Sequence, residues 1–159
     1  NETIGVFKRP ANHAPIPVQI NYQKGELRAE ARSAGEIVAQ DILITAGAPH
    51  NILLTPHKTK IANNRDDISY VRATIVDENG VRCPNAFHLI EFEIDGAGEL
   101  VATDSADIFG HEQYTSSERP AYMGECIAII KANKSNGKIK VTARAEGVDG
   151  IATTEIIVE

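Results

Sequence analysis

Aromatic side chains are scarce in this chain: phenylalanine and tyrosine make up 5% of the residues, and tryptophan is absent. A hydrophobic core must therefore be built mainly from Ile, Val, Leu and Ala. Cysteine is equally rare, and Cys83 and Cys126 cannot supply the four ligands of a structural zinc site. The spacing of the two cysteines alone is compatible with a single disulfide. We favour two free thiols, because Cys83 precedes a proline in a turn whereas Cys126 opens an expected strand.

Long apolar runs and clusters of basic residues are also missing. No run approaches the roughly 20 residues needed to cross a bilayer. The first residues, NETIGVFKRP, contain no apolar signal-peptide core, so we take the chain for a mature product or an excised segment. The formal net charge is −6 and Lys and Arg are scattered, so a nucleic-acid partner is not expected.

What the sequence does contain is period-two alternation of apolar and polar residues, without an amphipathic helical pattern. Residues 26–32, 88–94 and 137–147 alternate most strictly. Further strands are expected at Thr3–Lys8, Val18–Asn21, Glu36–Thr45, Asn51–Thr55, Tyr70–Asp77, Glu99–Thr103, Cys126–Ala132 and Ala152–Val158. Turns rich in Gly and Asn separate them. Many short strands at this spacing predict an all-β protein with an immunoglobulin-like β-sandwich.

The stretch TAGAP, residues 45–49, predicts a boundary between two domains. Residues 50–159 contain enough strands for one complete immunoglobulin-like β-sandwich. Residues 1–47 offer only about four strands, and half a sandwich cannot cover its own apolar face. We therefore expect residues 1–47 to be a partial β-sandwich, truncated on its N-terminal side.

An ordered series of motifs runs through both parts: GELRA at residue 25, TAGAP at residue 45, LTP at residue 54, VDENG at residue 76 and GAGEL at residue 96. In this order they resemble the C-terminal accessory domains of bacterial glycoside hydrolase family two enzymes, the β-galactosidase-like group. No single motif is decisive, since immunoglobulin-like modules of adhesins share some of them. The order and the linker are more specific.

The resemblance implies a function for the chain. The catalytic barrel with its two glutamates would lie upstream, and this region would be non-catalytic, packing against the barrel or a subunit partner. The parent enzyme would hydrolyse β-glycosidic bonds, and carbohydrate would be reached only through it. The resemblance implies the N-terminal part of the same enzyme as partner, with a homo-oligomer as an alternative, and implies no cofactor. Such enzymes are commonly periplasmic or secreted, but the sequence specifies neither compartment nor sugar.

The stretch ADIFGHEQY, residues 106–114, looks most like an active site. His111-Glu112 matches the start of a zinc-protease motif, but Thr115 stands where the second histidine is needed. Carboxylates such as Asp104, Asp107 and Glu112 could form a glycosidase pair only on rigid elements around a bound sugar. They fall instead in an irregular loop of a chain poor in sugar-stacking aromatics. Neither catalytic residues nor a metal site are predicted.

We therefore predict that residues 104–119 form a long ordered loop whose polar groups contact a neighbouring domain. Asp104 and Asp107 should cap turns by accepting backbone N–H groups. The candidate binding or domain-contact residues are Asp104, Asp107, His111, Glu112, Tyr114 and Arg119. The main alternative is a stand-alone bacterial surface or carbohydrate-binding module, which could use Phe109, Tyr114 and Tyr122. An independent enzyme is a third and weaker hypothesis.

Overall fold

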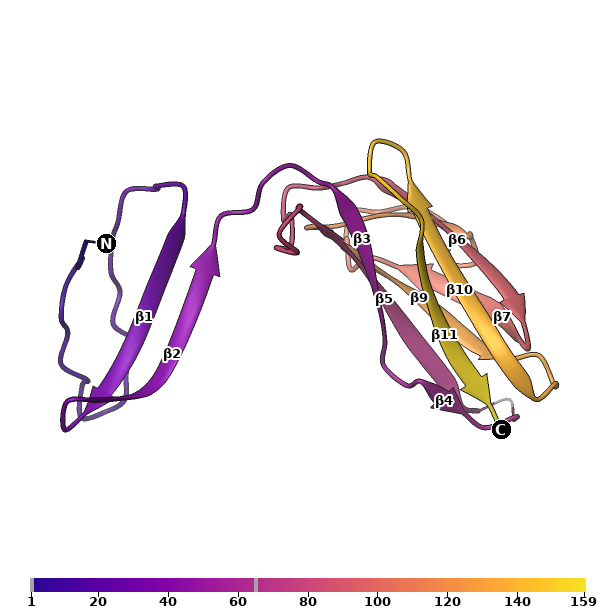
Figure 1. The fold of residues 1–159 in the computed structure, drawn as a ribbon, viewed down its shortest axis with the longest axis horizontal. Coiled ribbons are helices and arrows are strands. Elements are labelled where there is room, and N and C mark those ends of the chain that lie inside the picture. Colours follow the sequence, from indigo (N-terminus) through magenta and orange to yellow (C-terminus); the bar gives the residue numbers. More distant parts are fainter. Residues whose placement is uncertain (1, 65) are drawn as a thin grey trace. The chain divides into compact units, whose positions relative to one another are not determined.

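The computed structural model describes residues 2–64 and 66–159 and contains strands but no helix within these residues, which confirms the all-β prediction (Figure 1). The chain divides into two compact units, Asn1–Thr45 (unit 1) and Ala46–Glu159 (unit 2). Unit 1 contains β1 (Glu26–Ser33) and β2 (Glu36–Ile44). The strands of unit 2 are β3 (Asn51–Pro56), β4 (Lys60–Ile61), β5 (Ile68–Val76), β6 (Leu89–Gly96), β7 (Gly98–Asp104), β8 (Glu118–Pro120), β9 (Glu125–Ala132), β10 (Gly137–Ala145) and β11 (Ala152–Val158).

Unit 2 is a β-sandwich of the expected immunoglobulin-like kind. One sheet has the order β4-β11-β10-β6-β8 and the other the order β3-β5-β9-β7. All pairs are antiparallel except β4 with β11. A single apolar core draws residues from both sheets. In β10, for example, Ile139, Val141 and Ala143 are buried while Lys138 and Lys140 are exposed, as alternation requires.

The core composition follows from the shortage of aromatic residues. Phe92 is the only aromatic side chain among the buried hydrophobic residues that the structure describes, and isoleucine, valine and alanine supply most of the rest. Cys83 and Cys126 are buried in this core as free thiols, as expected from a turn position for Cys83 and a strand position for Cys126. Burial raises the pKa of Cys126 to about 12 and also raises that of Cys83, so both behave as small apolar residues.

The residues of unit 1 that the structure describes, 2–45, form a single hairpin. β1 and β2 pair antiparallel with Leu27 opposite Leu43, and every residue of β1 is exposed. The strands predicted at Thr3–Lys8 and Val18–Asn21 are wrong, since both segments have no strand assignment in the structure. Alternation makes a segment suited to a sheet, but a strand also requires a neighbouring strand to accept and donate its backbone hydrogen bonds. The described residues of unit 1 provide none for these two segments.

Candidate functional site

The predicted loop connects the two sheets at one end of the sandwich. It leaves β7 at Asp104 and returns at Glu118, where β8 begins on the edge of the other sheet. The loop also folds back on β7: the Thr103 backbone N–H donates to the Tyr114 carbonyl at 2.7 Å, and the Thr103 hydroxyl donates to the Ser116 carbonyl at 3.0 Å. The returning segment thus occupies hydrogen-bonding groups at the end of an edge strand that would otherwise be open.

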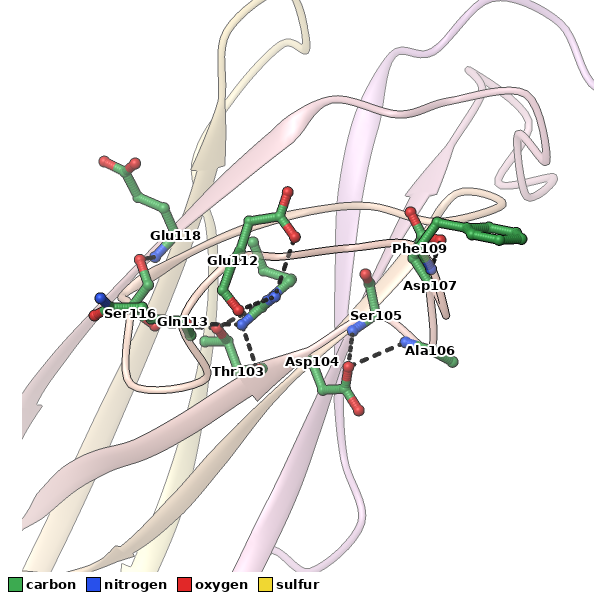
Figure 2. A network of polar contacts seen from close by, with 11 residues as sticks. Thr103, Asp104, Ser105, Ala106, Asp107, Phe109, Glu112, Gln113, Ser116 and Glu118 are labelled. Carbon is green, nitrogen blue, oxygen red and sulfur yellow. Dashed lines mark hydrogen bonds and ion pairs between the residues drawn. The ribbon is translucent and has the colours of Figure 1, made fainter.

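Arg119, in β8, holds this arrangement from inside, since only 3% of its surface is exposed. One guanidinium nitrogen donates to the carbonyls of Thr103, at 2.8 Å, and Gln113, at 2.9 Å, and Nε donates to the Thr103 hydroxyl at 3.2 Å. Nη1 donates to the Glu112 carbonyl at 3.4 Å and lies 3.6 Å from its carboxylate, and the guanidinium carbon is 5.6 Å from the centre of the Tyr114 ring. Figure 2 shows Thr103, Glu112 and Gln113 gathered around these contacts. Arg119 therefore braces the loop rather than forming part of its exposed surface.

The two aspartates of the loop accept backbone hydrogen bonds, as predicted. The Asp104 carboxylate accepts from Ser105 N at 2.8 Å and from Ala106 N at 3.2 Å. Asp107 accepts from Phe109 N at 3.0 Å (Figure 2). Each forms an Asx-type turn that fixes the direction of the chain. One oxygen of each carboxylate therefore accepts hydrogen bonds that stabilise the local turn.

The remaining predicted residues lie on the outside of the loop. His111 and Tyr114 are exposed, and Glu112 is exposed apart from its approach to Arg119. No group of three or more His, Cys, Asp or Glu residues that could hold a metal ion occurs in residues 2–64 and 66–159. What the geometry offers is a preorganised loop: its interior is held by one arginine, and its outer surface is free to contact another molecule or domain.

Sequence reasoning missed the structural importance of Asp77. Asp77 is 5% exposed and accepts backbone N–H groups from Gly47 at 2.7 Å, Asn79 at 2.9 Å and Val81 at 2.9 Å. These donors, Gly47 first, hold the pKa of Asp77 below its ordinary value. The DENG turn could have identified the two local contacts, but the contact to Gly47 joins segments 30 residues apart.

Comparison with known proteins places this sandwich in a family. The model of a family described as "Glycoside hydrolase family 2 C-terminal domain 5" matches residues 52–154, which include the whole β7–β8 loop. The chain belongs to this family. The resemblance seen in the sequence motifs is thereby confirmed: the family is one of C-terminal domains, which is the position that the motifs predicted.

Relatives extend the family match. A beta-galactosidase of Bacteroides ovatus is 29% identical over 144 residues, covering 91% of this chain and 17% of the relative. A beta-galactosidase of Thermoanaerobacter pseudethanolicus is 28% identical over 130 residues, covering 77% of this chain and 17% of the relative. The crystal structure of a glycosyl hydrolase family 2 member from Bacteroides cellulosilyticus is 27% identical with a TM-score of 0.83, covering 88% of this chain and 18% of that one. The chain thus spans about one sixth of the curated relatives' length.

Proposed function

We propose that the chain serves a β-galactosidase-like glycoside hydrolase as its non-catalytic C-terminal region, packing against the rest of that enzyme. The parent would hydrolyse β-glycosidic bonds in carbohydrate breakdown with residues that lie elsewhere in its polypeptide. The proposal is carried by the match of residues 52–154 to a family of C-terminal domains. The two similar beta-galactosidases agree with it, because this chain covers only 17% of each of them.

The chemistry of the β7–β8 loop supports a structural role for this region. General acid–base hydrolysis of a glycoside needs two carboxyl groups facing a shared space for the sugar. Asp104 and Asp107 instead accept backbone N–H groups within their own turns, and the Glu112 carboxylate approaches Arg119. These residues shape a loop, which is the kind of task an accessory domain performs.

Residues 1–47 are, in this proposal, part of an immunoglobulin-like sandwich completed by strands from another segment of the same polypeptide. In the described part of unit 1 no residue is buried, although β1 alternates as regularly as the strands of unit 2. A lone hairpin is marginally stable in water, so its apolar face needs a second sheet. The alignment to the Bacteroides ovatus enzyme covers 91% of the chain and therefore extends into unit 1, within a polypeptide long enough to supply that sheet.

The decisive experiment compares the full-length parent polypeptide with the 159-residue chain on a panel of nitrophenyl β-glycosides. We expect turnover by the full-length polypeptide, greatest on the β-galactoside, and none above background by the chain alone. Turnover by the chain that disappears in Glu112→Gln would contradict the proposal. Retention of the chain on an immobilised glycan, with no glycosidase activity in the full-length polypeptide, would favour a carbohydrate-binding module instead.

A further inference from the structure

The two ends of the sandwich in unit 2 differ in surface chemistry. Residues 46–50 lead into β3 at one end of the sandwich, which we call the linker end. The strands that begin at this end are β3, β6, β9 and β11, and those that finish there are β5, β7, β8 and β10. The opposite, far end holds β4 and the C-terminus (Figure 1). Most exposed large hydrophobic residues of unit 2 lie at the linker end, among them Phe87, Ile108, Phe109, Tyr114, Met123 and Ile151.

The far end carries a different set of residues. Its turns, over 57–67 and 133–137, contain no exposed large hydrophobic residue at any position that the structure describes. They present Lys58, Asn64, Lys134 and Asn136 instead. Exposed apolar residues scattered singly need no explanation, but a gathering at one end of a domain indicates a contact surface.

The tip of the β7–β8 loop is the most exposed part of this apolar end. Ile108 is 86% exposed and the adjacent Phe109 is 79% exposed. In Figure 2 the Phe109 ring points away from the polar contacts of the loop. A flexible loop could fold such side chains back against the sandwich, but the turn at Asp107 and the contacts of Arg119 fix the backbone on both sides of the tip. The apolar pair is therefore presented outward by a preorganised support, which lowers the entropic cost of docking.

We propose that the linker end, with Ile108 and Phe109 as its most exposed apolar pair, docks against the part of the parent polypeptide that lies upstream of this chain. This inference rests on the proposed function and specifies the surface that performs it. Two observations favour this occupant over a second copy of the chain. The relatives carry this region as 17% of a much longer polypeptide, and the linker through which residues 46–50 join the sandwich enters at this same end. Tethering there gives the preceding segment a high effective concentration at the surface.

Cysteine labelling of the full-length polypeptide tests the inference. Phe109→Cys places a thiol at the loop tip, and Ser135→Cys places a matched thiol at an exposed position of the far end. The native polypeptide is treated with a maleimide, and modification of each peptide is followed by mass spectrometry. We expect Phe109→Cys to react at least tenfold more slowly than Ser135→Cys, with the difference abolished in denaturant. Phe109→Cys could itself weaken docking and so expose the new thiol. Ile151→Cys leaves the loop tip intact and controls for this, and we expect its modification to be slow as well.

The possible results separate the surface from the function. Equal labelling rates at Phe109→Cys, Ile151→Cys and Ser135→Cys would overturn the inference, and β-galactoside hydrolysis by the same preparation would leave the proposed function standing. Protection that disappears on dilution to the monomer would assign the surface to a second copy and would also overturn it. Protection that survives dilution in a polypeptide without glycosidase activity would uphold the docking surface and reject the proposed function.

Discussion

The two units carry the same kind of sequence pattern with opposite results. In unit 1, Leu27 and Ala29 of β1 alternate with charged residues and remain exposed. In unit 2, Ile139 and Val141 of β10 alternate with lysines in the same way and are completely buried. Alternation thus indicates which face of a paired strand should be apolar, whereas burial of that face depends on a second sheet, which unit 2 has and the described residues of unit 1 do not provide.

The difference also concerns how each unit is held together. Unit 2 has two sheets around one core, with loops such as residues 105–117 closing its ends. The described residues of unit 1 form one hairpin, and the two arginines of β1 pair within that strand, Arg28 with Glu26 and Arg32 with Glu30. Exposed pairs of this kind contribute little to stability. We therefore expect substitutions in unit 2 to matter far more in the isolated chain than matched substitutions in unit 1.

Core truncation should give the largest contrast. Ile130 of β9 is completely buried. Ile130→Ala should lower the free energy of unfolding by about 2–5 kcal/mol, because buried apolar surface is lost and a cavity remains. The matched change Leu43→Ala in unit 1 should cost less than about 0.5 kcal/mol, because Leu43 is already exposed. Urea denaturation of the 159-residue chain measures both.

Repeating the Leu43 measurement in the full-length polypeptide sharpens the comparison. If another segment covers the hairpin there, Leu43→Ala should cost roughly 2–4 kcal/mol, as for a buried leucine. A cost that stays near zero in both contexts would show that this face remains open to solvent, and the proposed completion of the sandwich would fail.

The buried arginine should give the next largest effect. Arg119→Met removes the donors that satisfy the carbonyls of Thr103 and Gln113, and we expect a loss on the order of 2–3 kcal/mol. Arg32→Met in unit 1 is the matched control and should change stability by less than about 0.5 kcal/mol, since Arg32 is exposed. Urea denaturation gives the energies. Limited proteolysis should show faster cleavage within residues 105–117 only in the Arg119 variant, and unchanged cleavage would mean that the loop is held by other contacts.

The same distinction explains which strands could be predicted. β11 occupies the predicted range, Ala152–Val158, because it is rich in β-branched residues and its partners β10 and β4 are present. β4 and β8 were missed because they are two and three residues long, too short to show a period. Their strand character comes from neighbours distant in sequence. The segments at Thr3–Lys8 and Val18–Asn21 show the opposite error, a suitable pattern without a neighbour.

Within the candidate site, contacts between residues close in the sequence could be predicted, and contacts between distant residues could not. The turns capped by Asp104 and Asp107 involve residues one or two positions away, so local chemistry suffices to predict them. The burial of Arg119 could not be predicted, because a charged residue after an irregular loop is ordinarily exposed. It is buried here because loop closure brings the carbonyls of Thr103 and Gln113 to its guanidinium group.

Asp77 should make the stability of unit 2 depend on pH. Its folded-state pKa is depressed by backbone donors, so its contribution is present above the ordinary aspartate pKa of about 3.9 and is lost as pH falls through the folded value. Asp77→Asn should therefore be less stable than the wild type at pH 7, and the gap should narrow in acid. Asp41→Asn in unit 1, an exposed aspartate bonded to its neighbour Ile42, should show no such gap. Thermal unfolding between pH 7 and pH 2 measures both, and a gap that is constant with pH would contradict the assignment.

The smallest effect should come from exposed ion pairs, where the two units again differ. Arg144 of β10 binds both carboxylate oxygens of Glu91 of β6, at 2.9 and 2.8 Å, and these hydrogen bonds lower the pKa of Glu91. This pair links two strands, whereas Glu26 and Arg28 lie two positions apart on one strand. We expect Glu91→Gln to destabilise the chain slightly at low salt and Glu26→Gln to have no measurable effect. The Glu91 effect should disappear in 1 M salt, where screening is strong, and below the folded pKa of Glu91, where the wild-type carboxylate is itself neutral. A loss for Glu91→Gln that persisted in 1 M salt would mean that packing of the side chain, rather than its charge, joins β6 to β10.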